Sequence, residues 1–374
     1  MSARSEDRID TIVIGGSQSG LAVGYHLART GVPFVILDEN PRIGDAWRRR
    51  WDSLRLFTPA RYDGLPGMRF PASPWTYPTK DQVADYLDAY ARRFELPVRS
   101  GTRVVAVRHD GHGFRVETEA REWRADNVVV ATGAYHVPRI PAFAPELGDA
   151  IVQLHSSEYE RPGQLAPGPV LVVGAGNSGA EIAMEVCRDH PTRLSGPDTG
   201  QEPTRAGSLP DRLLVPLMWL AASRILAVSN PIGRKARDHF LDPPRGIPLG
   251  RVRRKDIGDA GIERVPRTVG VEGGLPVVDG GRVLDVRTVI WCTGFVADYS
   301  WIDLPVFGDY GMPEHERGVV SGRPGLFFVG LPFQHTLSSA LIGGVGRDAA
   351  YIAARIRERR SVAPAAVAAG SSAG

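Results

Sequence analysis

Residues 170–179 read VLVVGAGNSG, an apolar run followed at once by three glycines in G-x-G-x-x-G spacing. The β-branched run reads as a buried strand, and helical periodicity follows the last glycine. In this strand–turn–helix setting Gly174 permits a tight turn, Gly176 lets a pyrophosphate approach the backbone, and Gly179 permits close helix–strand packing. The helix N-terminus would face the negative charge. The stretch therefore predicts a dinucleotide-binding unit, and a purely structural glycine turn is the alternative.

A similar unit opens the chain. An apolar run precedes GGSQSG at 15–20, and a second apolar run ends in Asp38, 23 residues after Gly15. Gly15 and Gly20 hold the outer glycine positions, while Ser17 stands where the middle glycine belongs. A carboxylate at the end of the second strand can accept hydrogen bonds from a ribose diol. We therefore expect a second nucleotide site here, with an ordinary strand-end turn at Asp38 as the alternative.

The second unit lacks an acid at the matching place. Its second strand reads Thr192-Arg193-Leu194-Ser195. Arg193 and Ser195 could face a ribose 2′-phosphate, which would favour NADP over NAD. Arg193 could equally be a solvated surface arginine.

The two units lie about 160 residues apart, and two strands end in the same dipeptide, at Thr132-Gly133 and Thr293-Gly294. This repetition predicts an α/β protein with two Rossmann-like dinucleotide-binding domains. We expect an FAD domain split between 1–160 and 288–374, with the NAD(P) domain at 161–287 inserted in it. The low-complexity residues after Val362 are expected to form a disordered tail. A flavin in the first site and a nicotinamide in the second would permit hydride transfer.

Composition excludes several other classes of protein. The 374 residues are 43% hydrophobic and 23% charged, with a net charge of +3, which is typical of a globular protein and not of a disordered one. The arginines are scattered between acids, so no nucleic-acid-binding face is expected. The two distant cysteines, Cys187 and Cys292, exclude a disulfide scaffold and a C-x-x-C redox pair. We expect no metal site and a cytoplasmic protein without a signal peptide.

One apolar segment requires a membrane test. The stretch from Leu209 to Val228 contains Asp211, Arg212, Pro216 and Arg224, whereas a spanning helix needs about 20 mostly apolar residues. We therefore expect a buried or substrate-lining helix and no stable membrane insertion.

The motifs of the chain resemble those of a known family, the single-component flavin-containing monooxygenases. It is most similar to the bacterial branch related to the plant indole-pyruvate monooxygenases. The resemblance covers about residues 9–357. It is carried by the order of seven segments, which are GGSQSGLA at 15–22, YPTKDQVADYLDAYARRF at 77–94, VVVATG at 128–133, HSSEY at 155–159, VLVVGAGNSGAEIA at 170–183, CTGF at 292–295 and GLFFVG at 325–330.

The resemblance implies FAD at the first glycine motif and NADPH at the second, with NADH as the other candidate. The residues it assigns to FAD are Gly15, Ser17, Gln18, Gly20, Asp38, Glu39, Trp47, Val104, Thr132 and Gly133. Those assigned to the nicotinamide nucleotide are Gly174, Gly176, Asn177, Ser178 and Gly179, with Arg193, Ser195, Thr293 and Gly294 as further candidates. Near the carboxyl end, Gly344 to Asp348, including Arg347, resembles a helix start that closes over the flavin ring.

Three features depart from the family pattern. The family fingerprint F-x-G-x-x-x-H-x-x-x-(Y/F/W) is matched by His155 and Tyr159, but Asp149 and Ile151 stand where Phe and Gly belong. Pro197 occupies a position where relatives often carry an arginine. The asparagine that often follows the tryptophan-rich loop is absent, and Thr58 is the nearest candidate for a catalytic partner.

The implied reaction is insertion of one oxygen atom from dioxygen into a small organic substrate through a flavin hydroperoxide. The aromatic loop from Trp47 to Tyr77 and the apolar segment 213–228 are the candidates for excluding water. The alternative is an NAD(P)H-dependent flavin oxidase or reductase that releases hydrogen peroxide. A binding protein that retains FAD without catalysis is a third reading. Homodimers are common in the family, so the resemblance implies a homodimer as the candidate assembly.

Overall fold

A parallel βαβ unit begins the first of two large sheets. The computed structural model describes residues 8–241, 248–308 and 311–368. Strand β1 (Arg8–Ile14) leads through α1 (Gln18–Thr30) to β2 (Phe34–Leu37), and β1 pairs in parallel with both β2 and β6 (Glu122–Val130). The sheet order is β3-β2-β1-β6-β5-β4, with β17 also paired to β6. The other strands are β3 (Val98–Arg99), β4 (Val104–His109), β5 (Phe114–Thr118) and β17 (Leu326–Phe328).

The apolar strands of this sheet are buried on both faces. Val13 and Ile36 belong to the cluster that includes residues of α1 and of α8 (Gly346–Ala368). Their neighbours Ile12 and Val35 point into a separate cluster on the opposite face. Alternation along a strand produces this division, and burial on both faces explains why the strands read as continuous apolar runs.

The second sheet is entirely parallel and has the order β11-β10-β9-β15-β8. Its central strand β9 carries the second glycine motif and leads into α4. The two sheets confirm the α/β class with two dinucleotide-type units, one of them interrupting the other. The elements concerned are β8 (Val152–His155), β9 (Val170–Val173), α4 (Asn177–Val186), β10 (Thr192–Ser195), β11 (Glu263–Val265) and β15 (Thr288–Trp291).

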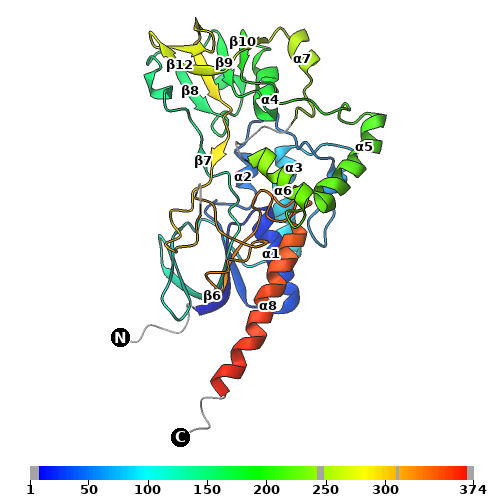
Figure 1. The fold of residues 1–374 in the computed structure, drawn as a ribbon, viewed down its shortest axis with the longest axis vertical. Coiled ribbons are helices and arrows are strands. Elements are labelled where there is room, and N and C mark those ends of the chain that lie inside the picture. The colour runs from blue at the N-terminus through cyan, green and yellow to red at the C-terminus, as the bar shows by residue number, and fades with distance from the viewer. Residues whose placement is uncertain (1–7, 242–247, 309–310, 369–374) are drawn as a thin grey trace.

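Sheet membership extends the second unit beyond the expected 161–287. Both β8 and β15 lie outside that range, yet β15 pairs with β8 on one side and with β9 on the other. Two short strands that lie between the sheets along the chain pair with each other, β7 (Val137–Pro138) and β16 (Phe295–Val296). Figure 1 shows β7 between the domains. We propose that the domain boundaries lie at these two short strands.

Several helices and short strands complete the fold. Helix α3 (Lys80–Arg93) begins with a capping box in which Thr79 accepts from the backbone of Gln82. Helix α8 packs on α1, and it continues to Ala368 where a disordered tail was expected after Val362; residues 369–374 lie outside the described residues. The other elements are α2 (Asp45–Arg48), η2 (Ala60–Tyr62), η3 (Ala144–Glu146), η4 (Pro162–Gln164), α5 (Leu209–Leu220), η5 (Ala221–Ile225), α6 (Pro231–Leu241), α7 (Arg254–Asp259), β12 (Thr268–Glu272), β13 (Leu275–Val278) and β14 (Arg282–Val283).

Helix α5 is not the buried helix that its apolar sequence suggested. Leu209, Leu213 and Leu217 are 75%, 77% and 63% exposed, and their four-residue spacing places them on one face. The opposite side holds Asp211, which is buried, and Trp219, which stacks on Tyr62. Within the three described ranges, no helix combines the length and the apolar character needed to cross a bilayer.

Candidate functional site

The first glycine turn is closed by contacts that only small residues permit. The N–H of Gly15 donates to the carbonyl of Leu37 at 2.7 Å, and its φ of +106° lies in the region that favours glycine. A Cβ on Gly20 would overlap the carbonyl oxygen of Gly15. Ser17 precedes α1, and its hydroxyl donates to Gln18 Oε1 at 2.6 Å. The turn thus brings the N-terminus of α1, with its free N–H groups, to the carboxyl edge of the sheet.

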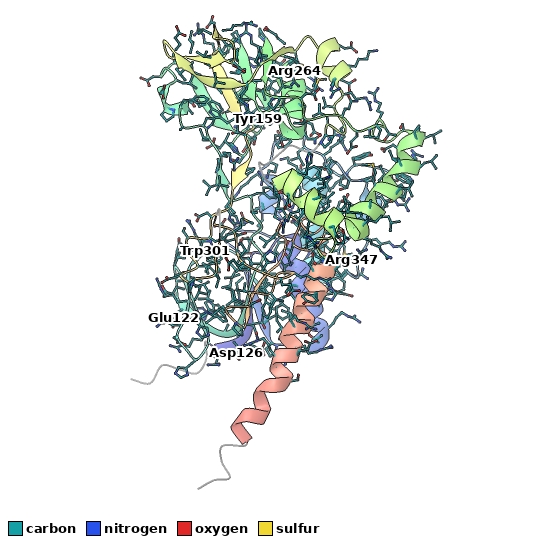
Figure 2. All side chains as sticks on the ribbon, viewed as in Figure 1. Glu122, Asp126, Tyr159, Arg264, Trp301 and Arg347 are labelled. Carbon is teal, nitrogen blue, oxygen red and sulfur yellow. The ribbon has the colours of Figure 1, made fainter. Side chains whose placement is uncertain are left out.

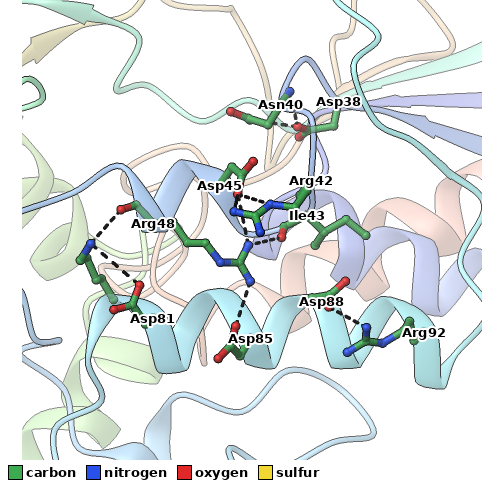
Figure 3. Close-up of polar contacts among 11 residues, drawn as sticks. Asp38, Asn40, Arg42, Ile43, Asp45, Arg48, Asp81, Asp85, Asp88 and Arg92 are labelled. Atoms are coloured by element: carbon green, nitrogen blue, oxygen red, sulfur yellow. Dashed lines mark hydrogen bonds and ion pairs between the residues drawn. The ribbon is translucent and has the colours of Figure 1, made fainter. Parts of the chain in front are cut away.

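Asp38 lies at this edge and is 8% exposed. Its Oδ2 accepts from the N–H of Gly16 at 2.5 Å, and its Oδ1 accepts from the backbone and side-chain nitrogens of Asn40 at 2.8 and 2.9 Å. Figure 3 shows the pair of Asp38 and Asn40. A carboxylate has about four acceptor positions, so Oδ2 retains one for a ribose hydroxyl. Glu39, the next residue, is exposed and faces Arg103 at 3.9 Å.

An ion-pair network fixes the loop that carries Trp47. The guanidinium of Arg48 donates to Asp45 at 3.2 Å, to Asp85 of α3 at 2.9 Å and to the carbonyl of Ile43 at 2.8 Å. Figure 3 shows these contacts bridging the loop and α3. Trp47 packs against the core beside this network. The loop is therefore held on the rigid part of the first domain.

Other residues assigned to FAD gather beside the same turn. Thr102, two residues before Val104 and β4, donates its N–H to the carbonyl of Asp38 at 2.8 Å. Thr132 follows β6, and its hydroxyl oxygen is buried and has no hydrogen-bond partner in the structure. An orphaned hydroxyl and a helix N-terminus at one sheet edge form the kind of polar lining that a dinucleotide would complete. These residues fit FAD.

The second glycine turn repeats this construction. Gly174 has a φ of +110°, and a Cβ there would overlap the carbonyl oxygen of Cys292. The space beside Gly176 is open, so a phosphate could approach the backbone. Asn177, the first residue of α4, accepts from Gly250 at 3.0 Å and donates to the carbonyl of Pro248 at 3.2 Å. The amide therefore holds segment 248–250 beside the turn.

Two residues expected to face a 2′-phosphate have other partners. Ser195 is fully buried, and its hydroxyl bonds to the carbonyl of Pro266 and to Thr268 Oγ1, both at 2.8 Å. Arg193 donates to Glu263 at 2.9 Å and to the carbonyl of Asp285 at 2.9 Å. Ser195 points into the interior of the second domain. Arg193 reaches toward the adjacent strand β11, which carries Glu263. Neither is placed to bind a nucleotide in this arrangement.

Two other arginines contact the loop that follows β10. Arg264 of β11 donates to the carbonyl of Gly196 in the loop after β10 at 3.0 Å, and Figure 2 labels it in the second domain. Arg254, at the start of α7, pairs with Asp198 of the same loop at 2.6 Å. Burial lowers the pKa of Arg264, and Arg254 lowers it further. Two cations against one carboxylate leave this loop with a net positive charge.

The two strand-to-Thr-Gly endings build the junction between the domains. The carbonyl of Gly294 accepts from the N–H of Arg139 at 2.9 Å, and Thr293 donates its hydroxyl to the carbonyl of Arg139. The carbonyl of Gly133 accepts from Tyr299 Oη at 2.6 Å. His155 lies 3.0 Å from the carbonyl of Gly294 and is fully buried. These residues join the domains, and any contact of theirs with a cofactor stays a prediction.

Thr58 has a partner that the sequence did not reveal. Its hydroxyl donates to Asp63 Oδ1 at 2.5 Å, and Asp63 is 2% exposed. The other carboxyl oxygen of Asp63 is buried without a hydrogen-bond partner. Burial raises the pKa of Asp63 to about 7, although the bond from Thr58 opposes the shift. Asp63 lies in the chain between Tyr62 and Gly64, which line a cavity.

That cavity has a volume of 1020 Å³ and lies against loop 60–75. Tyr62, Trp75 and Trp219 contribute aromatic walls, and Gly343 lies at its edge. The rings of Tyr62 and Trp219 stack at 4.9 Å, so α5 reaches the cavity by its last turn. Arg347, which Figure 2 labels at the start of α8, donates to the carbonyl of Ser223 in η5 and so fastens α8 to this region.

Sequence comparison identifies the family. A family model described as pyridine nucleotide-disulphide oxidoreductase matches residues 12–205. An uncharacterized oxidoreductase CzcO-like from Geobacillus kaustophilus (strain HTA426) is 41% identical over 350 residues, which cover 92% of this chain and 97% of that relative. The chain belongs to the pyridine nucleotide-disulphide oxidoreductase family. Members of this oxidoreductase family bind FAD and NAD(P).

Two further matches confirm the resemblance to flavin-containing monooxygenases. A probable indole-3-pyruvate monooxygenase, YUCCA3 of Arabidopsis thaliana, is 30% identical over 85% of this chain and 81% of its own. The structure of a flavin-containing monooxygenase from Stenotrophomonas maltophilia is 30% identical and superposes with a TM-score of 0.75 over 94% of this chain and 99% of that one. This member of the oxidoreductase family is therefore a flavin-dependent oxidoreductase with the two-domain fold.

The name of the family refers to disulphide oxidoreductases, but the two cysteines of this chain do not form a redox pair. Cys187 and Cys292 are both free. Burial raises the pKa of Cys292 to about 12, and burial also raises the pKa of Cys187. A thiol must ionise to act as a nucleophile, so neither is poised to attack a disulfide. Among the described residues, no three His, Cys, Asp or Glu side chains gather as metal ligands would.

Proposed function

We propose that this protein is an FAD-dependent, NADPH-consuming monooxygenase that acts on a small organic substrate. The observation that carries the proposal is the pair of glycine turns, each at the carboxyl edge of the parallel strands of its own sheet, on two domains linked at β7 and β16. In open α/β sheets that edge is where dinucleotides bind. FAD, when bound, would supply the redox chemistry that passes electrons from NADPH to dioxygen.

The first turn is the proposed FAD site. The N–H groups at the start of α1 bind the pyrophosphate, and the remaining acceptor position of Asp38 Oδ2 takes a ribose hydroxyl. The hydroxyl of Thr132 lacks a partner and supplies a further polar contact. The Arg48 network with Asp45 and Asp85 keeps this wall rigid, as a preorganised site requires.

The second turn is the proposed NADPH site. Gly176 leaves room for the pyrophosphate, and the net positive loop of Arg254, Arg264 and Asp198 lies where the adenosine ribose would fall. Arginine matches a phosphate bidentately, so the loop favours NADPH over NADH. These arginines take the role that Arg193 and Ser195 were expected to fill.

The cavity beside loop 60–75 is the proposed substrate region. Its aromatic walls can pack against an apolar substrate, and its volume suits a small organic molecule. Gly343 links it to the start of α8, where the resemblance places the flavin ring. Burial favours the neutral form of Asp63, so this carboxyl can hold a proton beside the wall although the bond from Thr58 opposes it.

An oxidase that releases hydrogen peroxide is the second candidate. It is favoured by the bond from Thr58 to Asp63, because a hydroxyl that already donates to a carboxyl cannot also donate to a bound oxygen species. Both candidates consume NADPH and dioxygen, but the monooxygenase forms an oxygenated product and the oxidase forms hydrogen peroxide.

Stoichiometry separates the candidates. The purified yellow holoenzyme is mixed with NADPH in air, with and without a panel of organic substrates, and NADPH consumption and hydrogen peroxide are measured together. A monooxygenase releases less peroxide per NADPH when its substrate is present. Peroxide equal to NADPH under every condition would instead establish the oxidase. A flavin that NADPH does not reduce under anaerobic conditions contradicts both.

A further inference from the structure

Arg50 lies where the first domain meets the second. Its N–H donates to the carbonyl of Trp47 at 3.0 Å, so it continues the rigid loop after α2. The next residue, Trp51, is 6% exposed and belongs to the apolar cluster of the second domain, which also contains Ala175 of the glycine turn. The loop of the first domain therefore reaches into the second domain at this point.

The guanidinium of Arg50 has an unusual setting. It lies over the ring of Phe295 at 5.4 Å, and that ring meets His155 edge-on at 4.9 Å. Throughout the part of the chain that the structure describes, no carboxylate or carbonyl pairs with this guanidinium. Burial alone lowers the pKa of Arg50, with no acid opposing the shift. Burial lowers the pKa of His155, Gly294 and Glu158 oppose the shift, and the charge of Arg50 lowers it slightly; neither form of a histidine carries a negative charge to pair with a guanidinium.

A charged group withdrawn from water is costly unless it is paired. The ring of Phe295 offsets only part of that cost. Arg48, two residues earlier, shows the ordinary solution, because it is held by Asp45 and Asp85. Arg50 is half-buried, and no acceptor among the described residues pairs with its guanidinium, so its donors are free to take an acceptor from a ligand. An arginine fork fits the oxygens of a phosphate.

The position of Arg50 indicates which phosphate group it would bind. Phe295 follows the loop that leaves β15, and the carbonyl of Cys292 in that loop packs against Gly174. Arg50 thus lies at the carboxyl edge of the second sheet, on the side of the first domain. We propose that Arg50 binds the pyrophosphate of the nicotinamide dinucleotide, opposite the N-terminus of α4. The inference rests on the proposed function, and it makes the bound nucleotide a bridge between the two domains.

The test measures binding without turnover. NADP⁺ and NAD⁺ are titrated into oxidised holoenzyme by calorimetry, for the wild type, Arg50→Gln and Arg50→Lys. The expected loss for Arg50→Gln is roughly tenfold to a hundredfold in Kd for both nucleotides, as for a hydrogen-bonded charge. Arg50→Lys should retain part of the affinity, because it keeps the charge but not the fork. Arg49→Gln, an exposed neighbour, is the matched control and should bind as the wild type does.

The outcomes separate this inference from the proposed function. A wild type that binds neither nucleotide contradicts the proposed function. A wild type that binds both, with Arg50→Gln binding equally well, contradicts only the role of Arg50. A loss confined to NADP⁺ would assign Arg50 to the 2′-phosphate, and a loss confined to a carboxylate substrate would assign it to that substrate; either result overturns the proposal. Flavin content reports folding, and Arg50→Lys carries the test if Arg50→Gln loses FAD.

Discussion

At the residue scale, the proposed preference for NADPH rests on side chains that sequence spacing did not indicate. Arg264 comes from β11 and reaches the loop after β10 through its bond to Gly196. Arg264 lies 90 residues beyond Gly174 in the sequence. It comes close to the loop after β10 because β11 pairs with β10, with Arg264 opposite Leu194. Spacing along one βαβ unit cannot reveal a residue that a neighbouring strand supplies.

Arg264→Gln should weaken NADPH binding and leave NADH binding nearly unchanged. The 2′-phosphate would lose one charge-assisted contact, which predicts roughly a tenfold rise in the Kd of NADPH. Lys255→Gln removes an exposed cation nearby and is the control. Titration of oxidised enzyme with NADP⁺ and NAD⁺ measures the effect. Equal losses for both nucleotides would show that Arg264 does not read the 2′-phosphate.

The buried carboxyl of Asp63 predicts a pH-dependent stability. Burial raises its pKa to about 7 in the folded protein, while an unfolded Asp titrates near pH 4. Between these values the folded state binds more protons, so the free energy of unfolding falls as pH rises through that window. Below about pH 4 both states are protonated, and above about pH 7 the loss is complete.

Asp63→Asn should remove part of this slope and stabilise the protein most above neutral pH. Urea unfolding across the pH range measures it. Glu181 has a pKa raised to about 7 by burial, so Glu181→Gln serves as a comparison that removes a slope of the same sign. If the wild type and Asp63→Asn lose stability in parallel from acid to alkaline pH, folding does not raise the pKa of Asp63.

At the element scale, α5 is held by its first turn and exposes its leucines. Asp211 is 1% exposed and accepts from Tyr77 Oη, Thr204 Oγ1 and the N–H of Gly207, each at 2.9 Å. Ser208 caps the same turn by accepting from the N–H of Asp211. The periodicity of 209–228 predicted a helix. It could not predict that the side with Asp211 would face the protein and the side with the leucines would face solvent.

Asp211→Asn should loosen α5 without unfolding the domains. Replacing the carboxylate leaves buried donors without their acceptor, at a cost of about 2 kcal/mol or more. Hydrogen exchange of the amides in 209–220 should become faster, while exchange in β1 and β9 stays slow. Tyr77→Phe removes one of the three bonds and should give a smaller effect. Exchange in α5 as slow as in the wild type would show that Asp211 does not anchor it.

Strand membership also belongs to this scale. The apolar strands and glycine turns are predictable because their signals are local in the sequence, and both turns are found where expected. The pairing of β15 with β8 and β9 depends on contacts between distant segments. A fully buried strand has the same apolar pattern in either sheet, so the pattern alone placed β8 and β15 in the wrong unit.

At the scale of the whole molecule, two dinucleotide-type domains share one narrow junction. Strand β7 pairs with β16 there (Figure 1). His155 and Trp51 secure the same region from opposite domains. Hydride transfer requires the two nucleotides to meet across this junction. The proposed contact of Arg50 with the pyrophosphate would hold the domains in that arrangement.

Labelled dioxygen tests the central claim of the account most directly. The holoenzyme is supplied with NADPH and a panel of small organic substrates under ¹⁸O₂, and the products are analysed by mass spectrometry. The account predicts a product that contains one labelled oxygen atom and forms only when NADPH is present. Label recovered solely in hydrogen peroxide, with every substrate returned unchanged, would contradict it.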